Sequence, residues 1–213
     1  MQKRRKITMQ RSYSGATFVH SKDEPHLGGN VLEGDIYTFC PQVWSYVIER
    51  FAIRSVLDLG SGIGYSAEFF YRKGLRTVAV DGLTDNVKLA LYPTICHDLT
   101  KSPVLTSVDL VHCQEVVEHI DERFLENVLL TLCCGRIILM THASPGQGGY
   151  HHVNEKSDRY WVRHLGRRGY NLLQEDTKRI RTIAKTERAA YMRATGLIFH
   201  KRAGLTARLQ FAR

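Results

Sequence analysis

The sequence has no apolar run long enough to cross a membrane, and its basic start at residues 1–6 is not followed by the apolar core of a signal peptide. It also has no internal repeat and no low-complexity tract. Its five cysteines form no C-x-x-C pair and their number is odd, which argues against a disulfide framework or a zinc ribbon. We therefore expect a cytoplasmic protein with reduced thiols and no membrane partner.

What is present is an ordinary globular composition with an uneven charge. Hydrophobic residues make up 43% of the 213 residues, and one domain with extensions is the simplest organisation. Residues 1–155 hold 15 Lys and Arg against 17 Asp and Glu, whereas residues 156–213 hold 15 against 4. An anionic substrate or nucleic acid would explain the basic C-terminal third, and so would solubility alone.

The densest motif follows an apolar run at residues 55–59. Glycines stand there in a G-x-G-x-G spacing, and a helix-compatible segment at residues 65–72 comes directly after them. Glycine lets the backbone approach a ligand closely, and the N-terminus of a helix directs N–H groups at it. The pattern predicts a site for a nucleoside-type cofactor, although the glycines could also serve only to close a tight turn.

With Asp58 included, the motif reads D-x-G-x-G-x-G and resembles motif I of the class I S-adenosylmethionine (SAM) dependent methyltransferases. In that family the turn wraps the amino acid end of SAM, and the acidic residue orders it directly or through water. The resemblance therefore implies that the cofactor is bound by Asp58, Gly60, Ser61, Gly62 and Gly64.

Further cofactor contacts are expected after the next strands. Asp81 ends an apolar run 21 residues after Gly60, close to the spacing at which an acidic residue meets ribose hydroxyls. The resemblance implies that Asp98 binds the adenine amino group and that Leu99 offers a backbone N–H to the ring. Asp98 could instead be a turn residue before the threonine that follows it. Gln114, just after the fourth strand, is also expected to contact the cofactor.

Apolar runs and helical segments alternate along the chain. This predicts an α/β fold with a Rossmann-like, doubly wound, mostly parallel seven-stranded sheet and helices on both faces. We expect strands near 55–59, 77–81, 94–99, 107–112, 136–141, 171–175 and 196–200, and helices near 41–51, 65–72, 83–92, 122–133, 160–168 and 176–193. The expected organisation is a flexible arm or lid at 1–34, a methyltransferase domain at 35–203 and a basic tail at 204–213.

An E-x-x-E-H run follows the fourth strand and contains Glu115, Glu118 and His119. Residues three and four apart can share a face in a turn that enters a helix. Two carboxylates and an imidazole that converge without a basic partner are costly unless a proton or a cation joins them. Three interpretations remain open: a metal site, a metal-free acid–base site, or a structural turn.

The same run resembles the magnesium-dependent O-methyltransferases, which include the enzymes that methylate the terminal ribose of small RNAs and those of ubiquinone biosynthesis. There a later histidine completes a site for a divalent ion such as Mg²⁺. Here that histidine would be His152, with His151 as a substitute, in a glycine-rich loop at residues 143–154. Its length makes this loop a candidate functional segment, with Tyr150 and Asn154 as hydrogen-bonding groups.

The sequence thus predicts a SAM-dependent methyltransferase that acts on a hydroxyl of a small molecule or sugar. The catalytic residues would be Glu115, Glu118, His119 and His152, with His119 or a neighbouring carboxylate taking the proton. One alternative is a metal-dependent RNA ribose 2'-O-methyltransferase, and another is a SAM-binding protein without catalysis.

Overall fold

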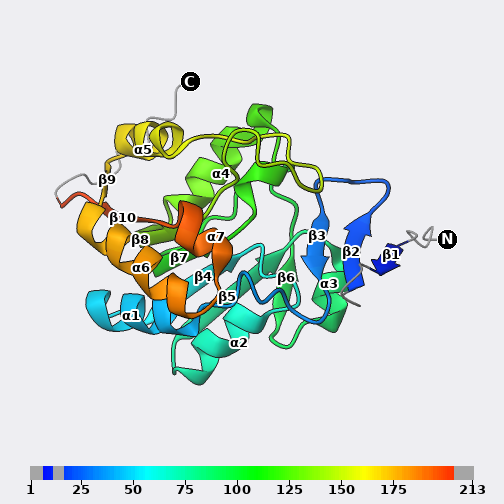
Figure 1. Ribbon diagram of the computed structural model, residues 1–213, viewed down its shortest axis with the longest axis horizontal. Coiled ribbons are helices and arrows are strands. Elements are labelled where there is room, and N and C mark those ends of the chain that lie inside the picture. The colour runs from blue at the N-terminus through cyan, green and yellow to red at the C-terminus, as the bar shows by residue number, and fades with distance from the viewer. Residues whose placement is uncertain (1–6, 12–16, 204–213) are drawn as a thin grey trace.

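The computed structural model describes residues 7–11 and 17–203, and its centre is a seven-stranded sheet (Figure 1). The strand order is β6-β5-β4-β7-β8-β10-β9, and β10 runs antiparallel to both of its neighbours. The strands are β4 (Ser55–Leu59), β5 (Arg76–Asp81), β6 (Thr94–Cys96), β7 (Val108–Cys113), β8 (Gly135–Met140), β9 (Tyr170–Leu172) and β10 (Leu197–Lys201). The predicted fold class is confirmed.

Helices bury both faces of this sheet. One face carries α1 (Pro41–Phe51), α2 (Tyr65–Arg72), α6 (Gln174–Thr186) and α7 (Ala190–Thr195). The other face carries α4 (Leu125–Leu132) and α5 (Asp158–Arg167). Every residue of β4 is buried, because a parallel strand covered on both sides has no solvent face, and this explains its aliphatic Val56, Leu57 and Leu59.

The sheet reverses its winding direction at β4. From β4 the chain passes through α2 to β5 on one side, and it later returns to β7 on the other side. Connections that leave neighbouring parallel strands in opposite directions open a crevice at the carboxyl ends of those strands, where ligands bind in folds of this kind. The glycine motif lies at this point.

Three predicted helices differ from the structure. The segment expected at 176–193 is split into α6 and α7, because Arg188 adopts a left-handed conformation with φ of 63°. The segment expected at 83–92 forms only α3 (Thr84–Leu89), since the chain turns so that the amide of Leu91 donates to the carbonyl of Ile63 in the glycine loop. The segment expected at 122–133 begins with a 3₁₀ turn, η2 (Glu122–Phe124), before α4.

The N-terminal segment contains strands that its polar, glycine-containing sequence did not indicate. A small antiparallel sheet is formed by β1 (Ile7–Arg11), β2 (Thr17–Ser21) and β3 (Gly28–Val31), and it stands at the opposite end of the molecule from β9 (Figure 1). Residues 7–11, 17–21 and 28–31 of the predicted arm are thus strands, and whether the arm is flexible or acts as a lid stays a prediction. Residues 1–6, residues 12–16 and the predicted tail at 204–213 lie outside the described residues.

Within residues 7–11 and 17–203, none of the helices combines the length and the apolar character that crossing a membrane requires.

Candidate active site

A cavity of about 620 Å³ lies at the carboxyl ends of β4, β5 and β7. Six parts of the chain surround it: the segment 26–39, the glycine loop, the end of β5, the segment 97–99, the segment 112–120, and the connection between α6 and α7. Its lining includes His26, Asn30, Thr38, Trp44, Asp58, Gly60, Ser61, Gly62, Asp81, Asn86, Leu99, His112, Gln114, Glu115, His119 and Tyr191.

The glycine loop forms the floor of this cavity. Gly60, Gly62 and Gly64 all have positive φ, at 68°, 57° and 86°, so a side chain at any of them would be strained. The amides of Gly60 and Ser61 both donate to the carbonyl of Val80, which ties the loop to β5. The hydroxyl of Ser61 is buried and has no hydrogen-bond partner, and a buried polar atom that faces a cavity in this way fits a bound ligand.

Asp81 ends β5 and faces the cavity from beside this loop. Its carboxylate accepts hydrogen bonds from the amide of Gly62 at 2.8 Å, from the amide of Leu83 at 2.9 Å and from the side chain of Asn86 at 3.1 Å. Burial is the largest influence on this group and raises the pKa of Asp81 to about 6, against the opposing effect of those donors. Ribose hydroxyls would add further donors to a carboxylate that is already oriented.

Asn30 of β3 reaches the same place from the N-terminal sheet. The side-chain amides of Asn30 and Asn86 exchange hydrogen bonds of 3.2 and 3.0 Å. The N-terminal sheet is thereby fastened to the residue that orients Asp81. Neither asparagine was predicted as part of the site, since each stands in a polar stretch without a motif.

Asp58 is buried beneath the loop, with 1% of its surface exposed. Its Oδ1 lies 2.6 Å from Nδ1 of His112, and its Oδ2 accepts a hydrogen bond of 2.6 Å from the hydroxyl of Ser66. Asp58 lines the cavity, but both of its oxygens already have partners within the protein. Its expected role in ordering the amino acid end of SAM remains a prediction.

Of the two residues predicted to contact adenine, Leu99 lines the cavity and Asp98 does not. Leu99 lines the cavity and is buried. The carboxylate of Asp98 accepts a hydrogen bond from the amide of Thr100 at 2.8 Å and lies 3.1 Å from Nε2 of His26. The turn contact that the sequence left open is therefore present, and His26 holds the segment before β3 over this end of the cavity.

Gln114 also lines the cavity, but its side-chain amide nitrogen donates to the carbonyl of Thr38 at 2.9 Å. Its Oε1 lies 3.7 Å from Sγ of Cys40. The side chain thus supports the segment 35–40, which forms a wall of the cavity. A direct contact with the cofactor remains a prediction.

Three of the four predicted catalytic residues form a cluster. Single ligand atoms from Glu118, His119 and His152 all lie within 4.8 Å of one another. Glu118 is completely buried, and neither of its carboxylate oxygens has a hydrogen-bond partner; Nδ1 of His119 likewise has none, and Nδ1 of His152 lies 3.6 Å from Oε1 of Glu155. Oxygen and nitrogen atoms that converge in this way without hydrogen-bond donors are suited to binding a cation.

The electrostatics of the cluster follow from its burial. Desolvation, together with the neighbouring charge of Glu115, holds the pKa of Glu118 well above its ordinary value. Desolvation and the proximity of His152 and His151 lower the pKa of His119 to about 4, so that this imidazole is neutral at neutral pH. A neutral imidazole can accept a proton or bind a metal ion.

Glu115 stands at the edge of the cluster and faces the cavity. Its backbone is left-handed, with φ of 54°, and its Oε1 accepts a hydrogen bond of 2.7 Å from the hydroxyl of Thr141. Strained non-glycine residues gather at functional sites, where the surrounding structure holds them in place. Burial is the main reason that the pKa of Glu115 is raised.

The glycine-rich loop reaches the cluster through backbone hydrogen bonds. The amides of Val153 and Asn154 both donate to the carbonyl of Glu118 at 3.0 Å, and the side chain of Asn154 donates to the carbonyl of Val117 at 3.3 Å. With the loop anchored in this way, the ring centroids of His152 and His119 lie 5.0 Å apart. Asn154, expected as a substrate contact, is used to fasten the loop.

Comparisons with known proteins agree with this architecture. Residues 57–133 match the family profile described as a methyltransferase domain. No curated protein sequence matches the chain.

Solved structures share the fold at low sequence identity. A SAM-dependent methyltransferase from Archaeoglobus fulgidus aligns with a TM-score of 0.55 and 18% identity, covering 80% of this chain and 96% of that one. The methyltransferase domain of bacterial CtHen1 aligns with a TM-score of 0.55 and 14% identity, covering 79% and 100%. The [4+2]-cyclase SpnF aligns with a TM-score of 0.53 and 16% identity, covering 77% and 82%.

Structural likeness at these identities shows the fold alone, and the domain profile adds the activity. The matched profile, the seven-stranded sheet and the glycine loop at its switch point together identify the chain as a SAM-dependent methyltransferase of the class I fold.

Proposed function

We propose that this methyltransferase transfers the methyl group of SAM to a hydroxyl group of a sugar or another small hydroxylated metabolite, and that a divalent cation assists it. The observation that carries the proposal is the cluster of Glu118, His119 and His152 beside the cofactor cavity. A hydroxyl is a poor nucleophile at neutral pH, so an enzyme that methylates it must help it to lose its proton.

The residues of the cluster fit a divalent ion. A buried carboxylate without any donor is costly, and a cation would supply the missing partner for both oxygens of Glu118. One or two carboxylates with two imidazoles form a mixed set of oxygen and nitrogen ligands, which suits Mg²⁺ less than Mn²⁺ or another transition ion. Glu118, His119 and His152 would hold the ion, with Glu115 at its side.

A bound cation would supply Lewis acidity that lowers the pKa of an acceptor hydroxyl. The chain itself contributes the remaining functions. Glu115 and His119 both line the cavity that contains the glycine loop, so they face an acceptor placed next to the cofactor. The neighbouring carboxylate of Glu115, whose pKa is raised by burial, can take the hydroxyl proton, because His119 would already be a ligand of the ion. Holding the acceptor beside SAM supplies a large part of the acceleration through proximity and alignment.

The test is methyl transfer from labelled SAM to the components of a fractionated cell extract, with and without a chelator. We expect label in a small hydroxylated product, lost on chelation and restored by Mg²⁺ or Mn²⁺. Label that persists in the chelator would contradict the metal, whereas label on a nitrogen or carbon atom would contradict O-methylation. A complete lack of label in any fraction would favour the alternative of SAM binding without catalysis.

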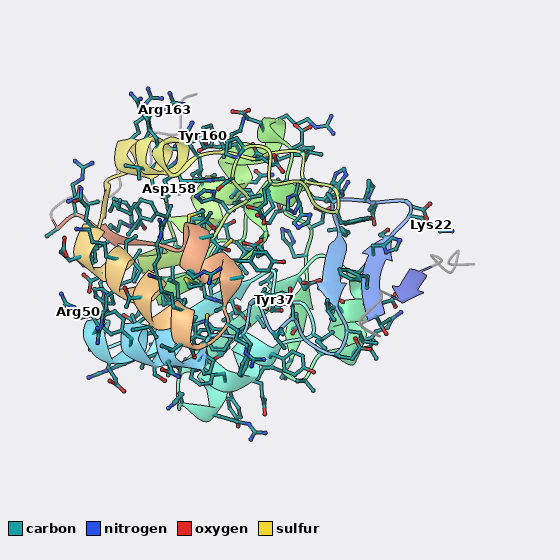
Figure 2. All side chains as sticks on the ribbon, in the orientation of Figure 1. Lys22, Tyr37, Arg50, Asp158, Tyr160 and Arg163 are labelled. Atoms are coloured by element: carbon teal, nitrogen blue, oxygen red, sulfur yellow. The ribbon has the colours of Figure 1, made fainter. Side chains whose placement is uncertain are left out.

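A second candidate acceptor is the ribose of RNA, and one surface favours it. Arg159, Arg163 and Arg167 recur every four residues on α5 and are exposed, and no described carboxylate pairs with them. Figure 2 shows Arg163 at the outer edge of the molecule, with Tyr160 nearby on the same helix. If RNA is the acceptor, its binding should weaken steeply with salt, and replacing the three arginines by alanine should reduce that dependence. A small neutral acceptor should respond to neither change.

A further inference from the structure

Asp58 and His112 face each other in the centre of the sheet. They are paired in register across the parallel strands β4 and β7, and Oδ1 of Asp58 lies 2.6 Å from Nδ1 of His112. Their side chains are 1% and 4% exposed, respectively. On the far side of the imidazole, the indole nitrogen of Trp44 in α1 donates to Nε2 of His112 at 3.2 Å.

The contact with Asp58 assigns the proton of Nδ1. A carboxylate can only accept, so at 2.6 Å it is Nδ1 of His112 that donates to Asp58. The indole N–H of Trp44 approaches the other ring nitrogen, Nε2. With the hydroxyl of Ser66 donating to Oδ2 at 2.6 Å, both oxygens of Asp58 are held by donors from different elements.

The same histidine lies against the wall of the cavity. Oε1 of Gln114 is 3.3 Å from Nε2 of His112, while the amide nitrogen of Gln114 donates to the carbonyl of Thr38. Asp58, Trp44, His112, Gln114 and Thr38 all line the cavity. A buried ring thus connects the floor, where Asp58 lies, with the segment 35–40 at its side.

We propose that His112 is a positioning residue for SAM: by donating from Nδ1 it fixes the orientation of the Asp58 carboxylate and leaves that group ready for the ammonium of the cofactor. A carboxylate held by donors on both oxygens cannot rotate toward another partner, so less ordering remains for the moment of binding. The inference depends on the expected contact between Asp58 and the amino acid end of SAM, and it is independent of acceptor and metal.

The test is calorimetric binding of SAM and of its demethylated product to purified variants, without acceptor and with a chelator present. His112→Leu removes the donor, and we expect its Kd for SAM to rise at least about tenfold, because hydrogen bonds to charged groups are the stronger ones. His112→Asn keeps an amide donor near the position of Nδ1 and should stay within about threefold of the wild type. Trp44→Phe keeps the aromatic packing and the Nδ1 contact with Asp58, so its loss should be smaller than that of His112→Leu; an equal loss would overturn the proposal.

A double-mutant cycle separates positioning from simple packing. If His112 acts through Asp58, then His112→Leu should weaken SAM binding no further once Asp58→Asn is present. Additive losses, equal losses in the leucine and asparagine variants, or a wild-type Kd in His112→Leu would overturn the proposal. Melting curves show whether each variant folds; if the leucine variant does not, the cycle is run with His112→Gln, whose amide reaches toward the position of Nε2 and offers no donor at Nδ1.

Discussion

Val116 occupies the space that a β-carbon on Gly60 would need: a methyl group built at Gly60 would overlap Cγ2 of Val116. The first glycine of the motif is thus required for two reasons, since its φ is positive and its open side is filled by the segment that leads to Glu118 and His119. The cofactor loop and the E-x-x-E-H run are packed directly on each other.

Gly60→Ala should therefore lower the free energy of unfolding by more than backbone strain alone would. Gly74 also has a positive φ, at 81°, but nothing lies within 4 Å of its added β-carbon, so Gly74→Ala is the matched control and should cost only about 1–2 kcal/mol. We expect Gly60→Ala to lower the melting temperature further and to abolish SAM binding. Adding Val116→Ala should restore part of both, and equal effects of the two glycine variants would show that the overlap with Val116 does not matter.

SAM binding should depend on pH through Asp81. Its pKa of about 6 means that the group is ionised at pH 7.5 and protonated at pH 5. The ionised form accepts hydrogen bonds from ribose hydroxyls better than the protonated form, so SAM affinity should fall as the pH drops through about 6. Calorimetry across this range is the measurement. Asp81→Asn should bind weakly at every pH and lose the dependence, and a titration that survives in this variant would assign it to another group.

Glu118→Gln should eliminate methyl transfer and weaken Mn²⁺ binding by at least about tenfold, because a ligand charge is lost at an otherwise unchanged site. The Kd for SAM should change little. Glu122, which is exposed and pairs with Lys156, is the matched control, and Glu122→Gln should leave transfer and Mn²⁺ binding intact.

The melting temperature of Glu118→Gln is informative in the metal-free protein. Since neither carboxyl oxygen of Glu118 has a hydrogen-bond partner, replacing the group by an amide of the same size breaks no hydrogen bond and should not lower stability. Turnover that survives in this variant would rule out the assigned role of Glu118.

Tyr150→Phe should loosen the N-terminal sheet from the glycine-rich loop. The phenol donates to the carbonyl of Ser21 at 3.2 Å, while the ring packs on His20 with 5.1 Å between centroids. Removing the hydroxyl keeps the packing and should cost about 1 kcal/mol of stability. We expect faster amide hydrogen exchange in β2 and unchanged exchange in β7. Unaltered exchange in β2 would show that the link does not restrain the sheet.

The parts that could be predicted from the sequence depend on local pattern. Burial on both faces accounts for the aliphatic Val56, Leu57 and Leu59, and the turn after the strand requires glycine, so β4 and its loop can be predicted without a structure. The register of Asp81 follows from the length of one strand–helix–strand unit. The meeting of Glu118 with His119 follows from their adjacency.

Other parts depend on contacts that sequence spacing does not encode. The helices α6 and α7 are separated at Arg188, which adopts a left-handed conformation. A glycine at this position would have predicted the end of a helix, but an arginine does not. His152 lies in the cluster because the amides of Val153 and Asn154 donate to the carbonyl of Glu118 and so position the loop. A polar residue inside a mostly apolar strand indicates that His112 has a buried partner. The sequence does not show that this partner is Asp58, because the pairing depends on the register of β4 and β7.

Several contacts join residues 17–39 to the rest of the described chain: Asn30 meets Asn86, His26 meets Asp98, Tyr150 meets the carbonyl of Ser21, Gln114 meets the carbonyl of Thr38, and Val19 and Leu27 pack on Leu83. Asn30 and Asn86 line the cavity, and Asn86 donates to the carboxylate of Asp81. This segment therefore forms one wall of the cavity and also supports the carboxylate at the end of β5. Substitutions in it that alter the choice of acceptor should thus change the affinity for the methyl donor as well.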